Sequence, residues 1–266
     1  MRCPSTLLLL ALLSCGGAAE TSSTAARRII DLSHAYDATT VYWPTAEGFE
    51  LREDSRGWTD AGYYYEANSF TTAEHGGTHL DAPIHFAEGR WTVDEIPLEQ
   101  LVGPGVLVDV TGSCSVDRDH LVTVEEFVFF ESRHGRIPAG AIVLLYTGFG
   151  HQWPDRAAYM GTAERGPGAV SNLHFPGLHP DAARWLVTER SIGAIGLDTP
   201  SIDHGPSSDF MSHQVLFEAN VPALENVANL DLLPATGFEV FALPMKIRGG
   251  SGGPVRIAAL VSGAGP

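Results

Sequence analysis

The sequence predicts a single domain of the mixed α/β class. Its 266 residues suit one large domain, and 44% of them are hydrophobic, enough to build a buried core. Short apolar runs bounded by glycine and proline predict buried strands, and one segment combines a helix with the strand that follows it. No internal repeat or domain linker interrupts this pattern.

The individual elements follow from these runs in chain order. A helix is expected over residues 180–188, where a proline opens a segment with apolar residues at helical spacing. The stretch Gly103-Pro104-Gly105 should bound a strand expected at residues 106–110, and the glycine-rich stretch 249–253 should be the turn before a strand expected at 255–261. Strands are expected at residues 29–32, 106–110, 141–146, 192–197, 240–243 and 255–261.

The N-terminus has the pattern of an export signal. Arg2 precedes an apolar run from Leu7 to Leu13, which ends in small residues and is too short to span a bilayer. The residues around Cys15 resemble a bacterial lipobox, in which Cys15 would carry a lipid; ordinary cleavage after Ala19 is the alternative. Either outcome predicts an exported protein, in the periplasm or at the cell surface, whose only membrane contact would be a lipid anchor at Cys15.

The chain therefore divides into a signal segment (1–19), a polar tether (20–27) and a folded domain (28–266). Only Cys114 would remain in the domain, so no intrachain disulfide is expected, and no activating pattern surrounds this thiol. The formal charge is −16 and Lys246 is the single lysine. Such a surface repels phosphate backbones, which excludes nucleic acid as a partner.

Four potential metal ligands or bases fall within eleven residues: His75, His79, Asp81 and His85. Their odd numbers place them on one face of an extended chain, but a straight strand would hold His75 and His79 roughly 13 Å apart. The Gly76-Gly77 pair supplies a bend that can bring them together. Imidazole and carboxylate ligands suit zinc, manganese or iron(II), and so few ligands leave a position open for water, as in catalytic sites.

The stretch H-G-G-T-H-L-D-A-P-I-H-F at residues 75–86 resembles the signature H-x-G-T-H-x-D-x-P-x-H of the cyclase family. That family includes bacterial kynurenine formamidases (arylformamidases) and isatin hydrolases. The resemblance extends over nearly the whole chain after the signal, and it implies the swivelling β/β/α fold and a homo-oligomer. Supporting matches are D-L-S-H at 31–34, Y-W-P at 42–44, L-L-Y-T-G at 144–148, F-P-G-L-H-P-D-A-A-R-W-L at 175–186, G-L-D-T-P-S-I-D at 196–203 and A-L-P-M-K-I at 242–247.

The resemblance also implies a second pair of ligands, a histidine and a glutamate twelve residues apart, which His213 and Glu225 match. The implied first site is His75, His79 and Asp81, and the second is Asp81, His213 and Glu225, with Asp81 bridging. His85 would be the catalytic acid/base and Trp43 an aromatic wall for substrate. The expected cofactor is Zn²⁺ or Mn²⁺, with one or two ions per chain.

The resemblance implies hydrolysis of a C–N amide bond in a small aromatic substrate, either a linear aryl formamide or an isatin-like lactam. Thr45-Ala46 replaces the Gly-Asp that follows Trp-Pro in formamidases, and the stretch from Glu47 to Phe70 is longer and more aromatic. This departure weakens the case for N-formylkynurenine. A lactone hydrolase with the same site is one alternative, and an exported, non-catalytic metal-binding lipoprotein is another.

Two smaller questions stay open at this level. Asp198 and Asp203 follow the strand expected at 192–197, and they either belong to the site or cap a turn. Tyr63, Tyr64 and Tyr65 either form a half-buried strand or line the ligand pocket.

Overall fold

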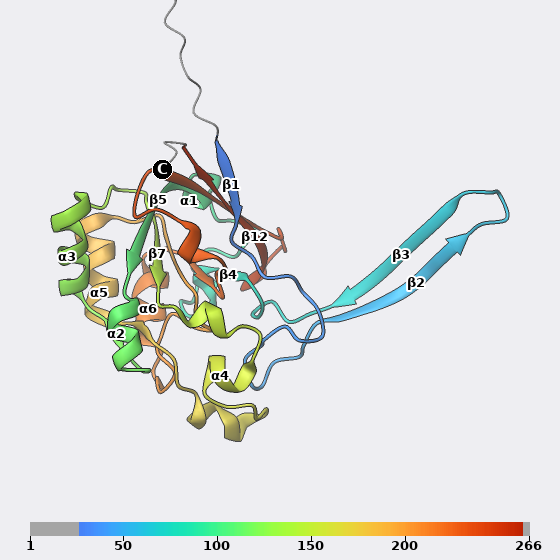
Figure 1. Cartoon of the computed structure of the whole chain (residues 1–266), viewed down its shortest axis with the longest axis horizontal. Helices are drawn as coiled ribbons and strands as arrows, with labels where there is room; N and C mark the ends of the chain where they lie inside the picture. The colour runs from blue at the N-terminus through green and yellow to red at the C-terminus, as the bar shows by residue number, and fades with distance from the viewer. Residues whose placement is uncertain (1–26, 263–266) are drawn as a thin grey trace, which may run out of the picture.

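A closed barrel of seven strands forms the centre of the computed structural model, which describes residues 27–262 (Figure 1). The strands are β1 Arg28–Asp31, β2 Glu50–Trp58, β3 Tyr64–Thr71, β4 His79–Asp81, β5 Val102–Asp109, β6 Leu121–Val122, β7 Ile142–Tyr146, β8 Gly177–Leu178, β9 Ala194–Leu197, β10 Ala223–Glu225, β11 Phe238–Pro244 and β12 Gly252–Val261. The barrel order is β12-β11-β5-β7-β9-β10-β4, and β4 pairs back onto β12 while β1 extends the sheet beside β12. Strands β5, β7, β9 and β10 run parallel, and the remaining barrel pairings are antiparallel.

Helices cover the outer face of the parallel strands, where α3, α5 and α6 lie together (Figure 1). The helices are α1 Leu98–Leu101, α2 Thr111–Val116, α3 Val124–His134, α4 Arg156–Met160, α5 Pro180–Trp185 and α6 Met211–Glu218, joined by 3-10 turns at Pro83–His85, Phe149–Gln152, Pro167–Asn172 and Leu230–Leu232. Along β7, Ile142 and Leu144 join the core inside the barrel, whereas Val143 and Leu145 pack under the helices. Because alternate residues of a strand point to opposite faces, β7 contributes side chains to both cores.

All six strands expected from the sequence are present, and β5 and β12 begin several residues earlier than expected. β5 includes Gly103-Pro104-Gly105, and β12 begins at Gly252 inside the expected turn. Gly105 is opposite Phe238 on β11, and the Phe238 ring fills the space above the glycine. β7 pairs with β5 only from Gly105 onward. The backbone N–H that Pro104 lacks therefore removes no hydrogen bond between β5 and β7.

The helix expected at 180–188 is confirmed as α5, although its last turn, Leu186–Arg190, is π-helical. Helix α3 was missed by the sequence reasoning. Its start carries a capping box, in which the Thr123 and Glu126 side chains satisfy backbone N–H groups, and that pattern is visible in the sequence.

A two-stranded arm, β2 with β3, projects far from the barrel (Figure 1). Nearly all of its side chains are exposed, including those of Tyr63, Tyr64 and Tyr65. These tyrosines therefore belong to an exposed ribbon, neither half-buried nor part of the pocket beside the histidine motif.

The signal segment at 1–19, the lipobox cysteine Cys15 and all of the tether except Arg27 lie outside the described residues. Among residues 27–262, no helix combines the length and apolarity needed to cross a membrane. Cys114 is buried on α2, and burial raises the pKa of its thiol to about 12, which fits a structural residue.

The contact between Gly105 and Phe238 generates a stability prediction. A Cβ at Gly105 would lie 2.0 Å from the Phe238 ring, so Gly105→Ala must displace a buried aromatic side chain. We expect a loss of about 1–3 kcal/mol in the free energy of unfolding, measured by urea titration. Gly112→Ala is the control, since nothing lies within 4 Å of its added Cβ. Equal stability of the two variants would contradict this packing.

Candidate metal centre

The backbone of the histidine motif bends at its two glycines, Gly76 and Gly77. Gly76 and Gly77 have φ values of 153° and 58°, which glycine adopts at little cost. A bridge between Tyr42 and Gly76 and a hydrogen bond from Gly77 N–H to the Val41 carbonyl hold the bend. As a result the His75 and His79 rings lie 5.5 Å apart between centroids, as the sequence required for a shared site.

Asp81 lies at the centre of two ligand clusters. In the first cluster, its Oδ1 is 2.7 Å from His75 Nδ1 and 3.0 Å from His79 Nε2. In the second cluster, its Oδ2 is 3.4 Å from His213 Nε2, which is itself 3.2 Å from Glu225 Oε1. Both groups of three expected from the sequence are therefore brought together, and they share Asp81.

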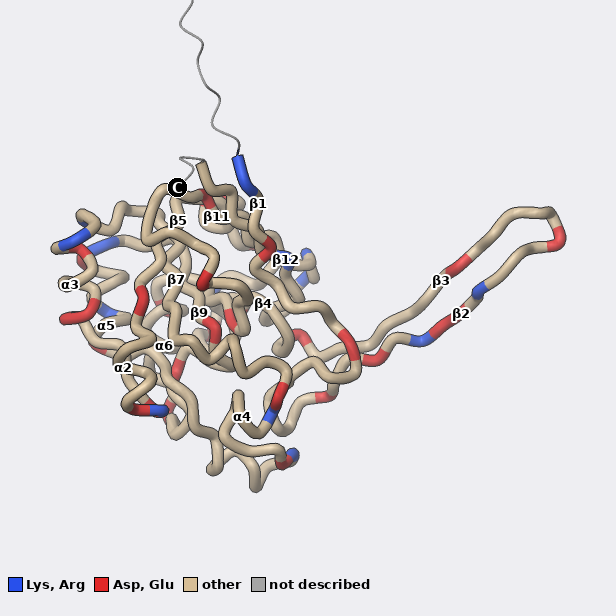
Figure 2. The backbone as a smooth tube through the Cα atoms, viewed as in Figure 1, with Lys and Arg blue, Asp and Glu red and all other residues tan. Residues whose placement is uncertain are grey.

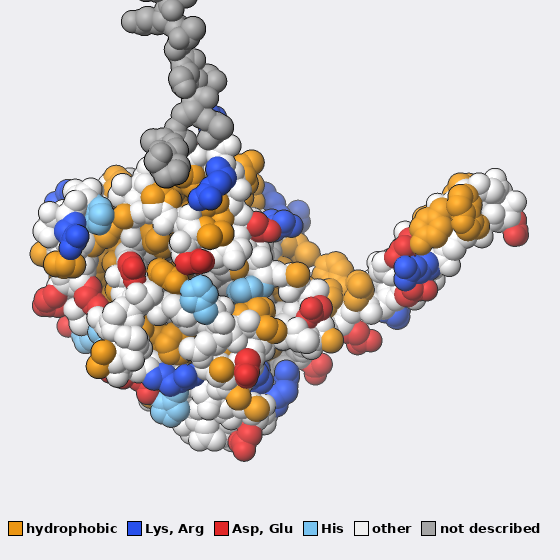
Figure 3. Space-filling view, in the orientation of Figure 1, with side chains coloured by type: hydrophobic (Ala, Val, Ile, Leu, Met, Phe, Trp, Pro, Cys, Tyr) orange, Lys and Arg blue, Asp and Glu red, His pale blue; other side chains and the backbone are white. Residues whose placement is uncertain are grey.

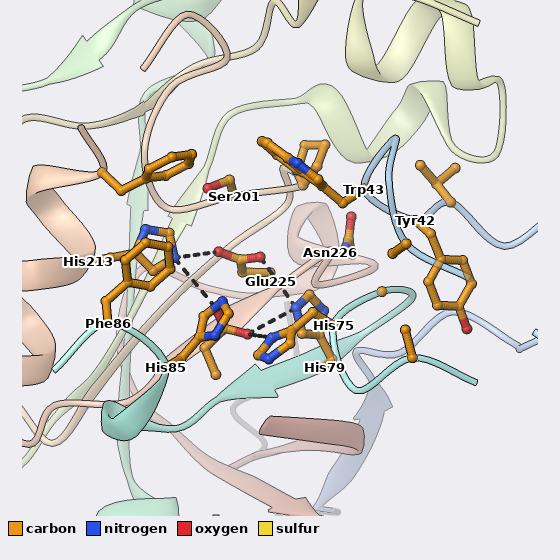
Figure 4. Close-up of a pocket in the computed structure, with 17 residues that line it drawn as sticks. Tyr42, Trp43, His75, His79, His85, Phe86, Ser201, His213, Glu225 and Asn226 are labelled. Carbon is orange, nitrogen blue, oxygen red and sulfur yellow. Dashed lines mark hydrogen bonds and ion pairs between the residues drawn. The ribbon is translucent and has the colours of Figure 1, made fainter. Parts of the chain in front are cut away.

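Barrel closure brings the two clusters together. His79 and Asp81 lie on β4, and the antiparallel register of β4 with β10 places Glu225 directly opposite His79. Paired residues point to the same face of a sheet, so Glu225 Oε2 approaches His79 Nε2 to 3.4 Å. His213 comes from α6, and Figure 4 shows its ring pointing toward Glu225.

His79 has the tautomer that a metal ligand needs. Its Nδ1–H donates to the Gly77 carbonyl at 2.9 Å, so Nε2 is the nitrogen that would bind a cation in place of a proton. The Asn226 amide donates to the same carbonyl at 2.7 Å and thereby fixes its position. Nε2 is buried beside Asp81 and Glu225 but makes no hydrogen bond, a geometry that suits a ligand of a cation between them.

His75 is oriented by a serine far away in the sequence. Ser251 donates its hydroxyl proton to Glu74 at 2.7 Å, so it accepts from His75 Nε2 at 2.8 Å. The lone pair of His75 is then on Nδ1, which faces Asp81.

His213 is oriented by Asp203, which accepts its Nδ1–H at 2.6 Å. Asp203 also accepts the backbone N–H groups of Ser212 and His213 at the start of α6. Asp203 therefore has both of the roles that the sequence left open: it caps a turn, and it orients a histidine of the site. Asp198 serves a turn only, since its carboxylate accepts N–H groups from residues 147, 148 and 150.

The cluster concentrates negative charge in a buried place. Asp81 and Glu225 are 2% and 4% exposed, and a buried carboxylate requires a positive charge nearby. Although burial alone lowers the pKa of His79, the neighbouring Asp81 and Glu225 outweigh it and raise that pKa to about 10. The pKa of His213 is raised for the same reason by Asp203, Asp81 and Glu225. Imidazole and carboxylate donors in this arrangement fit a divalent cation such as zinc or manganese.

A pocket of about 330 Å³ opens directly over the cluster (Figure 4). Its walls include three aromatic side chains: Trp43 from the N-terminal loop, Phe86 at the end of the motif and Phe210 before α6. The His85 ring stacks on His75 at 3.8 Å and also borders the pocket. Within the described residues, no hydrogen bond holds the His85 side chain, unlike those of His75, His79 and His213.

Sequence reasoning missed Glu74, Ser251 and Asn226. Glu74 and Asn226 directly precede or follow ligand positions, which is the only sequence signal they carry. Ser251 lies in the glycine-rich stretch at the start of β12, and only the pairing of β12 with β4 reveals its role.

Comparisons with known proteins agree with this geometry. The sequence model of the Cyclase family matches residues 30–204. The isatin hydrolase of Roseibium aggregatum is 34% identical over 208 residues, covering 75% of this chain and 76% of its own length. The kynurenine formamidase of Salinibacter ruber is 28% identical over 233 residues, covering 86% of this chain and 95% of its own length.

Solved structures show the same likeness. Isatin hydrolase A from Labrenzia aggregata, bound to benzyl benzoate, superposes with a TM-score of 0.80 at 33% identity, covering 89% of this chain and 94% of that chain. Isatin hydrolase A from Ralstonia solanacearum gives 0.79 at 34% identity, covering 88% and 92%. From the barrel, the ligand clusters and these relatives together, this chain belongs to the cyclase family and is a metal-dependent hydrolase related to isatin hydrolases and kynurenine formamidases.

Proposed function

We propose that this protein hydrolyses the amide bond of a small, neutral aromatic compound, with an isatin-like lactam preferred over N-formylkynurenine. The observation that carries the proposal is the pocket above the metal cluster. Its walls carry several aromatic side chains, and neither lysine nor arginine is among the described residues that line it. Away from the metal ions, the α-carboxylate of N-formylkynurenine would be desolvated there without a cationic side chain, whereas a lactam with no ionised group would not.

In this proposal His75, His79 and Asp81 hold one ion, and Asp81, His213 and Glu225 hold a second. When bound, Zn²⁺ or Mn²⁺ polarises the amide carbonyl and lowers the pKa of a coordinated water. The aromatic walls, Trp43 included, hold the flat ring of the substrate with its carbonyl toward the cluster.

His85 is the proposed acid/base. Burial, the largest effect, lowers the pKa of its ring to about 4, so the imidazole is neutral at neutral pH and can accept a proton. It borders the pocket and makes no competing hydrogen bond among the described residues. Its task is to take a proton from the attacking water and deliver it to the leaving nitrogen.

The two alternatives differ from this proposal in specific ways. A lactone hydrolase would use the same groups on an ester carbonyl, and the pocket walls alone do not discriminate between the two carbonyls. A metal-binding protein without activity would need closed coordination. The cluster instead lies at the floor of a cavity large enough for a bicyclic aromatic compound, which favours catalysis.

A substrate comparison tests the proposal. The protein, loaded with Zn²⁺ or Mn²⁺, is assayed with isatin, N-formylkynurenine and an aryl lactone, and chelator-treated protein is the control. We expect kcat/KM for isatin to exceed that for N-formylkynurenine by at least about tenfold, because an unpaired buried charge costs at least about 1.4 kcal/mol. A preference for N-formylkynurenine would contradict the neutral-substrate proposal. Faster lactone cleavage would favour the first alternative, and loaded protein without any activity the second.

Replacing Asp203 tests how the second ion is held. Asp203→Asn removes the charged partner that fixes the His213 tautomer, so we expect the second ion to bind about 10–100-fold more weakly in equilibrium dialysis. Binding of the first ion should not change. Ser212→Ala is the matched control, because it removes a neighbouring buried hydrogen bond without touching His213. If both variants bound the second ion equally, the orienting role of Asp203 would be wrong.

Replacing His85 separates catalysis from metal binding. His85→Ala should retain metal and fold while kcat falls by about 10²–10⁴-fold, the usual contribution of an acid/base group. Asp81→Asn provides the comparison, since it should empty both clusters. Loss of metal in His85→Ala would make His85 a ligand, and retained metal with full turnover would remove it from the mechanism.

A further inference from the structure

One hydroxyl at the pocket above the metal cluster has no hydrogen-bond partner. Ser201 lines this pocket, and the whole residue is only 4% exposed. Within residues 27–262, its backbone neighbours are hydrogen-bonded but its Oγ bonds to no other group. Buried polar groups nearly always have a partner, and an exception beside a binding pocket points to a ligand that supplies the missing one.

The backbone on both sides of Ser201 is fixed. The Thr199 hydroxyl donates to the Ser201 carbonyl at 3.0 Å, and the Ile202 N–H donates to Glu225 Oε1 at 2.9 Å. The Asn226 N–H donates to the Thr199 carbonyl at 3.0 Å. These bonds tie the loop after β9 to β10 and to a residue of the second ligand cluster. A side chain on such a support is preorganised for contact with a bound molecule.

The other hydroxyl and amide groups at the pocket are already engaged. The Asn226 amide is bonded to two protein groups, and the Tyr42 hydroxyl is bonded to a threonine. Among the described residues that line the pocket, Ser201 is therefore the neutral donor left without a partner, and His85 is the imidazole with neither nitrogen bonded. A substrate can reach one free group for proton transfer and one for recognition.

Ser201 belongs to a stretch of the chain without lysine or arginine, since neither residue occurs between Arg190 and Lys246. Figure 2 shows Lys and Arg at the edges of the domain and on the arm, and none on β9. Figure 3 shows charged side chains of both signs spread over the viewed surface. A carboxylate next to Ser201 would lack a cationic side chain, so the hydroxyl suits a neutral acceptor such as a carbonyl oxygen.

Ser201 and His85 lie on opposite sides of the second ligand cluster. Figure 4 shows Ser201 on one side of the contact between His213 and Glu225, and His85 on the other. In a five-membered lactam, the scissile carbonyl carbon is bonded to nitrogen on one side and to a ring carbon on the other. When the nitrogen faces His85, which is to protonate it, that ring carbon faces Ser201.

We propose that Ser201 is a specificity-determining residue, whose hydroxyl donates a hydrogen bond to an oxygen on the ring carbon next to the scissile carbonyl. This inference rests on the proposed function and adds to it a residue that recognises the second carbonyl of the substrate. An aryl formamide has only hydrogen at that position and leaves the hydroxyl unpaired. Ser201 thereby discriminates between two neutral amides, which the lack of a cationic side chain cannot do.

Two neutral substrates provide the kinetic test. Isatin carries the second carbonyl, and formanilide lacks it. In Ser201→Ala we expect kcat/KM for isatin to fall about tenfold or more and that for formanilide to change by less than about twofold. Metal content should not change, because the hydroxyl holds no ligand. Equal losses for the two substrates, or no loss for isatin, would overturn the proposal.

The matched control is Ser212→Ala. Its hydroxyl is also buried, but it donates to the Leu178 carbonyl at 2.7 Å and does not line the pocket. Any effect of this change should be the same for both substrates. Ser201→Thr keeps a hydroxyl at the position and should retain the preference for isatin, whereas a loss as large as that of Ser201→Ala would contradict a role for the hydroxyl.

Binding separates this inference from the proposed function. Metal-loaded His85→Ala, which should turn over slowly, is titrated calorimetrically with isatin and with 2-oxindole, a lactam without the second carbonyl. Adding Ser201→Ala should shrink the ratio of the two dissociation constants about tenfold by weakening isatin alone. An unchanged ratio would overturn the role of Ser201. If the parent protein hydrolyses neither isatin nor formanilide, the proposed function fails, while the change in this ratio still decides on Ser201.

Discussion

Asp81 and Glu225 are two buried carboxylates on neighbouring strands of a closed barrel, and most features of the site follow from the need to balance their charge. Neither can be removed from water without a positive partner. Each histidine in contact with them has its other ring nitrogen hydrogen-bonded: His79 to the Gly77 carbonyl, His75 to Ser251 and His213 to Asp203. The outer hydrogen bonds thus direct three lone pairs toward one acidic centre, which prepares a cation site.

The barrel provides the rigidity that this centre requires. β4 has only three residues, yet it pairs with β10 on one side and β12 on the other. The first pairing aligns Glu225 with His79, and the second brings Ser251 to His75. A site assembled across the closing strand depends on every pairing around the barrel, so packing as remote as that of Gly105 against Phe238 contributes to its geometry.

Local signals in the sequence predicted six of the strands, one helix and the first ligand cluster, whereas His213 and Glu225 followed only from the family resemblance. A short apolar run marked β7, helical spacing marked α5, and the clustered histidines marked the metal site that includes β4. Residues such as Ser251 and Asn226 carried no such signal, since their roles arise from pairings between distant segments. The exposed arm could not be recognised either, because an aromatic strand has the same sequence pattern whether or not a core covers it.

The arm is attached to the body in a way that isolates it. Two contacts hold the ends of the arm together at its base: a hydrogen bond between Tyr42 and Thr72, and the β-bridge between Tyr42 and Gly76. The residues between Ala46 and Ala73 therefore form a loop whose ends are fixed independently of its length. Over evolutionary time such a loop can be lengthened, trimmed or exchanged while the ligand spacing stays unchanged. The same junction offers protein engineers a position for inserting a foreign module.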